Sequence, residues 1–233
     1  MDNYNKFAAE YDAFTRDTRN NDTEVELGRK LIARLLGECL QGKILDYGCG
    51  PGNCSRFLKS CGAEVVGVDI AQKEIEIAKS YHDGIDYHAI ESGRLEKLPS
   101  DFDAVVFSFV LLTISTMAEI VKILTACRGK IKPNGKLVIL NGNIEASHGR
   151  EFISFSIQAL TNPKSGDPVR VKLGRDRSLE VTDFYWTQAD YEAMLNQSGF
   201  VLDEVLEPIA TEGTEWRDER EYSPCKLMSA RPN

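Results

Sequence analysis

The chain lacks the patterns that metal sites, membrane spans and secretion leave in a sequence. Its six cysteines form no Cys-x-x-Cys pair and its histidines (His82, His88, His148) are scattered, so we expect no metal site. No apolar run is long enough to cross a bilayer, and the polar N-terminus does not read as a signal peptide. Scattered thiols in an unsecreted chain favour a cytoplasmic protein that does not associate with membranes.

An excess of positive charge is also missing. The 28 Lys and Arg residues are outnumbered by 36 Asp and Glu, for a net charge of −8. Phosphate contacts need clustered basic side chains, so we expect no nucleic-acid partner. A short basic run at 170–177 is interrupted by Asp176 and is interpreted as a solvated hairpin face, with an anionic partner as the alternative. With 233 residues the chain fits a single domain, 1–233, as a monomer or a homodimer.

Three alternating glycines follow the first apolar run. Residues 43–47 read as a short buried strand, and the pattern Asp46-x-Gly48-x-Gly50-x-Gly52 follows it. Glycines at this spacing let the backbone turn tightly and let a ligand approach main-chain N–H groups. Helical spacing over 53–59 indicates that the loop opens a helix N-terminus.

A dinucleotide-binding loop is the main rival interpretation of this pattern. The Gly-x-Gly-x-x-Gly fingerprint fails on register, because Asn53 and Ser55 stand where its third glycine would fall. The carboxylate of Asp46 would also repel a pyrophosphate, whereas it suits a ligand with a cationic part. A nicotinamide-dependent oxidoreductase is therefore the weaker alternative.

A second apolar run, residues 64–70, also ends at a carboxylate. Asp69 at the tip of the second strand of a βαβ unit can accept hydrogen bonds from two ribose hydroxyls. Ile70 beside it suits an adenine face. The alternative role for Asp69 is to cap the helix that begins near residue 72.

The segment 44–52 resembles the first motif of the class I S-adenosylmethionine-dependent methyltransferases, and 64–70 is similar to their second motif. The resemblance implies S-adenosylmethionine as cofactor, with S-adenosylhomocysteine as product, and a loop that holds the cationic methionine end. It also implies an acidic adenine contact after the third strand, where Glu91 replaces the more usual Asp. The cofactor-binding residues expected on these grounds are Tyr11, Asp46, Tyr47, Gly48, Gly50, Asn53, Asp69, Ile70, Glu91, Ser92, Ser108 and Phe109.

Strand and helix patterns alternate along most of the chain. We expect an α/β Rossmann-like, doubly wound sheet of seven strands, mostly parallel with an antiparallel C-terminal strand. Further strands are expected at 85–90, 103–111 and 132–140, with helices near 72–81, 116–128 and 187–198, and a C-terminal antiparallel pair at 201–206 and 225–230. Residues 1–40 read as two helical pieces over the cofactor site.

The alternation breaks over 142–186, which is expected to be an insertion that caps the acceptor site. A helix is expected near 150–160, followed by a β-hairpin whose strands are 169–173 and 179–185. Residues 182–191 resemble the corresponding region of small-molecule O- and N-methyltransferases of bacterial secondary metabolism. Loops in this place commonly carry specificity.

Methyl transfer from a sulfonium is an in-line displacement that asks the protein for alignment, water exclusion and sometimes a base. The predicted catalytic residues are His148, Tyr185 and Asn141, and the predicted acceptor-binding residues are Tyr4, Asn143, Trp186, Trp216 and Arg217. The alternative for the aromatic residues is packing, and for His148 a surface or capping role. We expect transfer to an O or N atom of a small molecule; the alternatives are a non-catalytic cofactor-binding protein and a protein methyltransferase.

Overall fold

Short apolar runs build the central sheet of this computed structural model, which describes residues 12, 14, 23, 25–212 and 215–233. The sheet has seven strands in the order β3-β2-β1-β4-β5-β10-β9. Every neighbouring pair from β3 to β5 is parallel, and β10 is antiparallel to both β5 and β9. The predicted fold class is confirmed. The strands are β1 (Lys43–Tyr47), β2 (Glu64–Asp69), β3 (Asp86–Ala89), β4 (Phe102–Ser108), β5 (Ile131–Gly142), β9 (Phe200–Leu206) and β10 (Cys225–Pro232).

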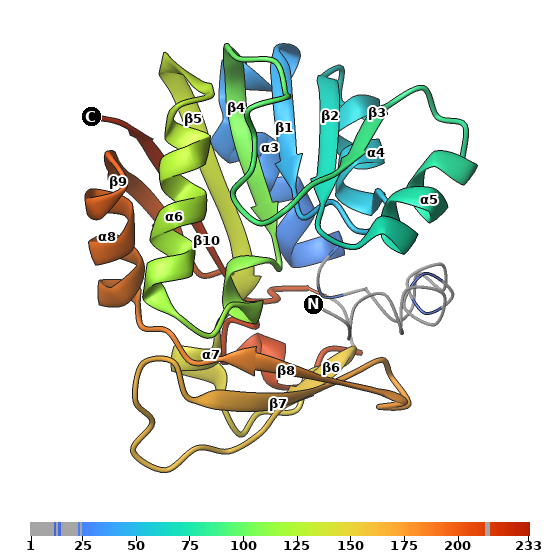
Figure 1. Cartoon of the computed structure of the whole chain (residues 1–233). Helices are drawn as coiled ribbons and strands as arrows, with labels where there is room; N and C mark the ends of the chain where they lie inside the picture. Colours follow the sequence, from blue (N-terminus) through green and yellow to red (C-terminus); the bar gives the residue numbers. More distant parts are fainter. Residues whose placement is uncertain (1–11, 13, 15–22, 24, 213–214) are drawn as a thin grey trace.

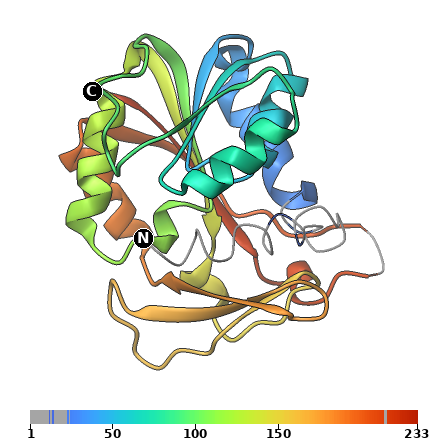
Figure 2. The same cartoon turned by 45° about the vertical axis from the view of Figure 1, so that its right-hand side comes forward.

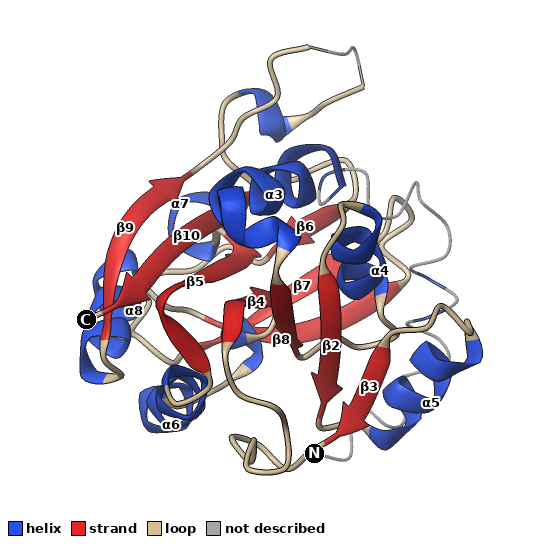
Figure 3. Cartoon of the chain, turned by 90° about the horizontal axis from the view of Figure 1, so that it is seen from above, coloured by secondary structure: helices blue, strands red, loops and turns tan. Residues whose placement is uncertain are grey.

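Helices cover both faces of this sheet, as expected for parallel strands that are apolar on both sides. The described helical segments, apart from a short helix before the small sheet, are η2 (Val25–Arg29), α3 (Lys30–Leu36), η3 (Gly37–Gln41), α4 (Asn53–Ser60), α5 (Gln72–Ser80), η4 (Leu111–Thr113), α6 (Met117–Arg128), α8 (Gln188–Gln197) and η5 (Asp218–Arg220). The view from above separates α3 and α4 on one side from α6 and α8 on the other (Figure 3). Within the described residues, every helix falls short of the length and apolar character that a membrane span requires.

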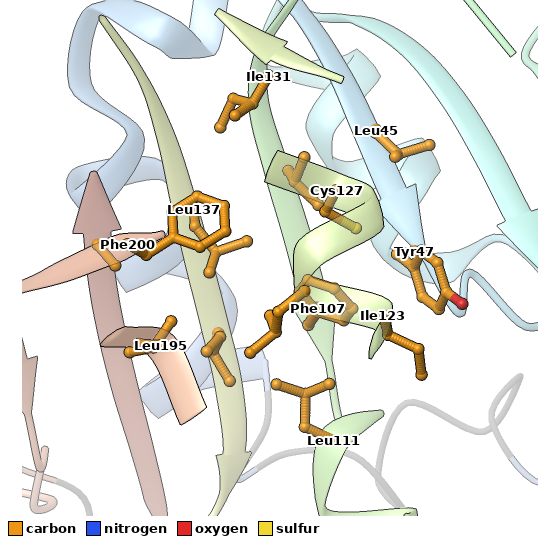
Figure 4. Close-up of a cluster of buried hydrophobic side chains, with 14 of the residues drawn as sticks. Leu45, Tyr47, Phe107, Leu111, Ile123, Cys127, Ile131, Leu137, Leu195 and Phe200 are labelled. Atoms are coloured by element: carbon orange, nitrogen blue, oxygen red, sulfur yellow. The ribbon is translucent and has the colours of Figure 1, made fainter. Parts of the chain in front are cut away.

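The larger of the two main hydrophobic clusters lies between the sheet and helices α6 and α8. Phe107 from β4, Ile123 from α6 and Leu195 from α8 are almost completely buried in it. Figure 4 shows these side chains together with Tyr47, whose ring centroid lies 5.1 Å from that of Phe107. Tyr47 therefore connects this cluster with the loop that follows β1.

Residues 142–186 leave the main sheet and form a second, smaller one. It has three antiparallel strands in the order β6-β7-β8, namely β6 (Phe155–Ile157), β7 (Pro168–Leu173) and β8 (Leu179–Phe184). The short helix α7 (Ile144–Ser147) precedes them. The small sheet lies beyond the carboxyl ends of the central parallel strands (Figure 1).

The expected hairpin is confirmed, but the helix expected near 150–160 is wrong. Phe155 and Ile157 instead pair with Leu173 and Val171 and add a third strand to the hairpin. An isolated two-stranded hairpin is marginal in water, and a third strand gives its apolar face more to pack against. Residues 171–173, which pair with 155–157, lie too far along the chain to influence a prediction made from the local spacing of 150–160.

Removal of a side chain from the larger cluster tests this packing. Phe107 has no exposed surface, so Phe107→Ala is expected to lower the free energy of unfolding by about 3–5 kcal/mol. Ile209 is 46% exposed, and Ile209→Ala is expected to change it by less than about 0.5 kcal/mol. Urea denaturation followed by circular dichroism measures both; equal effects of the two substitutions would contradict the assignment of the core.

Candidate functional site

A cavity of about 620 Å³ lies between the carboxyl ends of the central strands and the small sheet. The loops after β1, β2 and β4 line one side of it, and β6, β7 and β8 line the other. The view in Figure 2 shows the small sheet below those loops. Ligands of open α/β sheets bind at this end of the strands, so the cavity is the candidate site.

The glycine loop after β1 forms the floor of the cavity. Gly48, Gly50 and Gly52 have φ angles of 75°, 51° and 89°, in the region that other residues avoid. A Cβ on Gly48 would lie 2.4 Å from Cγ2 of Val110, whereas a Cβ on Gly50 would meet no atom within 4 Å. The loop is therefore packed from behind at Gly48 and open toward the cavity at Gly50, as a loop that cradles a ligand should be.

Asp69 fixes this loop to the end of β2. Its Oδ2 accepts a hydrogen bond of 2.9 Å from the amide of Gly50, and its Oδ1 accepts one of 2.8 Å from the amide of Ala71. A carboxylate has about four acceptor positions, so each oxygen keeps capacity for a ligand hydroxyl in the cavity that Asp69 lines. Ala71 is the N-cap of α5, so Asp69 also supports the start of that helix.

Asp46 lies under the loop and does not line the cavity. It has no exposed surface, and its Oδ2 accepts a hydrogen bond of 2.6 Å from Oγ of Ser55. Burial raises the pKa of Asp46 to about 6; the hydrogen bond from Ser55 opposes this, the charge of Asp69 adds to it, and the charge of Arg29 counteracts it. The structure thus gives Asp46 no direct route to a ligand, although its field acts on the loop from below.

Most of the other predicted cofactor-binding residues do line the cavity. They are Tyr47, Gly48, Gly50, Asn53, Asp69, Ile70, Ser92, Ser108 and Phe109. Glu91 is the exception after β3: its side chain is 86% exposed and lies 3.9 Å from Nε of Arg94. Its carboxylate is therefore turned to solvent, and an adenine contact through it stays a prediction. Tyr11 lies outside the described residues.

None of the described residues that we predicted for catalysis or acceptor binding lines the cavity. Nδ1 of His148 accepts a 3.3 Å hydrogen bond from the amide of Leu160, so one ring nitrogen is already used. His148 is also the C-cap residue at which helix α7 ends, which matches the capping role given above as its alternative. His148 is absent from the cavity wall because it belongs to the outer connection between α7 and β6.

Burial and packing account for the remaining predicted residues. Nδ2 of Asn141 donates to Oη of Tyr191 at 2.9 Å, and Nε1 of Trp186 donates to the carbonyl of Ile114 at 3.1 Å. Tyr185 packs against the cluster beneath the small sheet. Asn143, Trp216 and Arg217 also lie outside the cavity lining, and Tyr4 lies outside the described residues. Roles for these residues in acceptor binding therefore stay predictions.

Four charged residues of the cavity lining were missed by the sequence analysis. They are Arg29 at the end of η2, Glu74 on α5, and Glu180 and Asp183 on β8. Arg29 and Glu74 carry no sequence signal, because charged residues on helices usually face solvent. Asp183 does carry one: it stands at an apolar position of an alternating strand.

Glu74 is the most perturbed carboxyl near the glycine loop. It is 4% exposed, and its Oε2 has no hydrogen-bond partner in the described part of the chain. Burial raises the pKa of Glu74 to about 8, and the negative charges of Asp69 and Asp12 add to the rise. Among the described residues, no group of three or more His, Cys, Asp or Glu side chains is placed to hold a metal ion.

Known proteins are similar to this chain in sequence and in fold. Residues 44–135 match the family model described as a methyltransferase domain. N-demethylindolmycin N-methyltransferase of Streptomyces griseus is 30% identical over 165 residues, which cover 67% of this chain and 68% of that protein. A ubiquinone biosynthesis O-methyltransferase of Idiomarina loihiensis is 33% identical over 118 residues, covering 45% of this chain and 44% of that protein, so the match spans less than half of that relative.

Solved structures share the fold. The structure of a putative S-adenosylmethionine-dependent methyltransferase from Listeria monocytogenes has a TM-score of 0.65 and 19% identity, and the match covers 93% of this chain and 100% of that one. An S-adenosylmethionine-dependent methyltransferase from Mesorhizobium loti has a TM-score of 0.64 and 21% identity, with 87% and 96% covered.

The raised pKa of Glu74 makes stability depend on pH. Between its ordinary pKa and about 8 the folded state binds more protons than the unfolded state, so Glu74 makes stability fall as pH rises through that window. Glu74→Gln should therefore increase stability relative to the wild type by more at pH 9 than at pH 5, measured by urea denaturation at both values. Glu76→Gln, an exposed change on the same helix, is the control. A Glu74→Gln difference that does not change with pH would contradict the assignment.

Proposed function

This chain belongs to the S-adenosylmethionine-dependent methyltransferases, and on that premise we propose that it binds S-adenosylmethionine in the cavity and methylates an O or N atom of a small molecule. The observation that carries the proposal is the joint lining of one cavity by the glycine loop, Asp69 and the small sheet. One side of that cavity has the features of a nucleotide site, and the other leaves room for an acceptor.

The residues at the glycine loop fit the cofactor. When bound, S-adenosylmethionine supplies an electrophilic methyl group on a sulfonium. The open side of Gly50 leaves room for the methionine part, and the remaining acceptor positions of Asp69 suit two ribose hydroxyls. Arg29 supplies a guanidinium for a carboxylate, while the buried charge of Asp46 favours the cationic groups next to it.

Ile70 and the loop after β3 suit the adenine base of the cofactor. Ile70 lines the cavity next to Asp69 and is 37% exposed, which is unusual for a large aliphatic side chain in this protein. Ser92, the neighbour of the outward-facing Glu91, also lines the cavity and offers a hydroxyl and a backbone amide. An adenine ring packed on Ile70 would cover this apolar surface and reach Ser92 with its polar edge.

The small sheet supports a small-molecule acceptor. Its inner side brings Phe155, Ile157 and Val181 to the cavity, and these apolar side chains exclude water from the reacting atoms. The small sheet covers part of the site, so a small molecule that fits a cavity of about 620 Å³ is favoured over an extended protein segment. The names of the two relatives, N-demethylindolmycin N-methyltransferase and ubiquinone biosynthesis O-methyltransferase, support the same class of acceptor.

Calorimetric titration with S-adenosylhomocysteine tests the cofactor assignment. We expect a dissociation constant in the micromolar range, about −8 kcal/mol, and no comparable binding of NADH. Asp69→Asn should weaken S-adenosylhomocysteine binding at least tenfold, because it removes charge and one acceptor from the ribose contact. Asp101→Asn is the matched control, since Asp101 is exposed and its φ of 65° suits Asn. Tighter binding of NADH than of S-adenosylhomocysteine would overturn the proposal.

The open side of Gly50 gives an independent test. A Cβ there enters the cavity and not the protein, so Gly50→Ala should cost about 1 kcal/mol of stability through its positive φ and reduce S-adenosylhomocysteine affinity at least tenfold. Gly84→Ala carries the same backbone strain, with a φ of 71°, on an exposed loop outside the cavity lining. It should lose stability but not affinity. Equal affinities of the two variants would show that the ligand does not lie against Gly50.

A further inference from the structure

Asp183 breaks the apolar pattern of the small sheet. One face of the β7–β8 pair carries Val169, Val171 and Leu173 opposite Asp183, Val181 and Leu179, so five of these six side chains are aliphatic. The direct partner of Asp183 is Val169, which has no exposed surface. A carboxyl group at this register position has no role in packing the sheet, and a valine or leucine would fill it at lower cost.

The carboxyl group of Asp183 is buried and yet lines the cavity. The residue is 7% exposed, and within the described part of the chain its carboxylate makes no hydrogen bond. Burial raises the pKa of Asp183 to about 8. The charge of Asp183 acts on Tyr191 of α8. Burial raises the pKa of Tyr191, the hydrogen bond from Asn141 opposes the rise, and the charges of Asp183 and Asp190 add to it. A ligand that donates a hydrogen bond to the carboxylate of Asp183 would compensate for the cost of burying it.

The charges of the cavity indicate which donor fits. Asp183 is the carboxyl group that β8 presents on the face it shares with Val171 and Leu173, both of which line the cavity, whereas Glu180 lies on the other face of β8 opposite Lys172. Arg29 is the cationic residue of the described lining, and its charge acts on Asp46 under the glycine loop. A phenolate or carboxylate acceptor next to Asp183 would oppose the ionisation of its carboxyl group, whereas a protonated amine would favour the carboxylate form.

We propose that the acceptor carries a basic amine and that the carboxylate of Asp183 receives a hydrogen bond from its N–H and takes its proton. This inference rests on the proposed function and assigns its substrate class. It also assigns the catalytic base that was sought at His148 and Tyr185.

The reaction then balances as an N-methylation. The acceptor enters as an ammonium ion, and one N–H proton passes to a carboxylate oxygen of Asp183, which leaves the lone pair on nitrogen. That lone pair forms the new N–C bond with the methyl group while the C–S bond breaks, and its electron pair stays on sulfur. The products are S-adenosylhomocysteine and the methylated ammonium ion, and Asp183 returns its proton to water. A neutral amine is required because an ammonium ion has no lone pair and is repelled by the sulfonium.

A matched pair of probes tests the assignment. The protein is saturated with S-adenosylhomocysteine and titrated in a calorimeter with 2-phenylethylamine and with 2-phenylethanol, which differ only in the group offered to Asp183. We expect the wild type to bind the amine at least tenfold more tightly than the alcohol. Asp183→Asn should remove this preference and leave S-adenosylhomocysteine binding unchanged. With an amine that the wild type methylates, the same variant should lower kcat/KM at least 100-fold, the effect of losing a general base.

Asp176→Asn is the control, because Asp176 is an exposed carboxylate of the same hairpin outside the cavity lining, and an Asn oxygen can still accept the hydrogen bond from the amide of Ser178. It should retain the preference for the amine. Equal binding of the two probes, binding of neither, or a preference that survives Asp183→Asn would overturn the inference while leaving the cofactor assignment intact. If Asp183→Asn does not fold, the ratio for the wild type decides alone. Failure of the wild type to bind S-adenosylhomocysteine would overturn the proposed function together with this inference.

Discussion

The hydrogen bonds between the glycine loop and the end of β2 determine the geometry of the cavity. The amides of Gly48 and Cys49 both donate to the carbonyl of Val68, at 2.7 and 2.9 Å, and the amide of Gly50 donates to Asp69. These bonds close only if the backbone turns through positive φ at Gly48 and Gly50. They hold the loop against β2, set the position at which α4 begins, and keep the carboxylate of Asp69 at the edge of the cavity. The shape of the ligand site therefore follows from backbone geometry more than from side-chain contacts.

A set of buried carboxyl groups is the second property that unites the site. Asp46, Asp69, Glu74 and Asp183 all have a raised pKa, and in each of them burial is the largest cause. Burial disfavours the ionised form of each of these carboxyl groups, and a cation bound nearby would stabilise that form. A sulfonium and an ammonium are such cations. A sulfonium or an ammonium bound in the cavity would reduce the free-energy cost of burying these carboxylates, so on the proposed function this cost contributes to the affinity for both substrates.

The sequence predicts many of the residues that line the glycine-loop end of the cavity, because the signals there are local. An apolar strand that ends in Asp, a turn that needs glycine and a helix start all lie within a few consecutive residues, so the positions of Gly48, Gly50 and Asp69 follow from the pattern. The acceptor side depends on pairing between distant segments. The third strand of the small sheet replaces an expected helix because residues 155–157 pair with 171–173. His148 lies in the connection that leads to this strand and does not line the cavity, and no local sequence pattern indicates that placement.

The segment that carries the small sheet is anchored to the main sheet and its helices at both ends. Glu145 of α7 contacts Lys226 of β10 at 2.7 Å, and the hydroxyl of Ser147 donates to the carbonyl of Ser223 at 2.6 Å, so the insertion is fixed where it leaves β5. At its other end, Thr187 and Asp190 form a capping box that starts α8 on the main domain. Between these two anchors, most apolar side chains of the small sheet pack in a cluster of their own, which also contains Leu112 of η4, while Phe184 at the end of β8 packs against the cluster of the main sheet. A substitution on the inner face of β8, such as a carboxylate in place of an aliphatic residue, therefore changes the chemistry offered to the acceptor, while the hydrogen bonds that hold the glycine loop stay as they are.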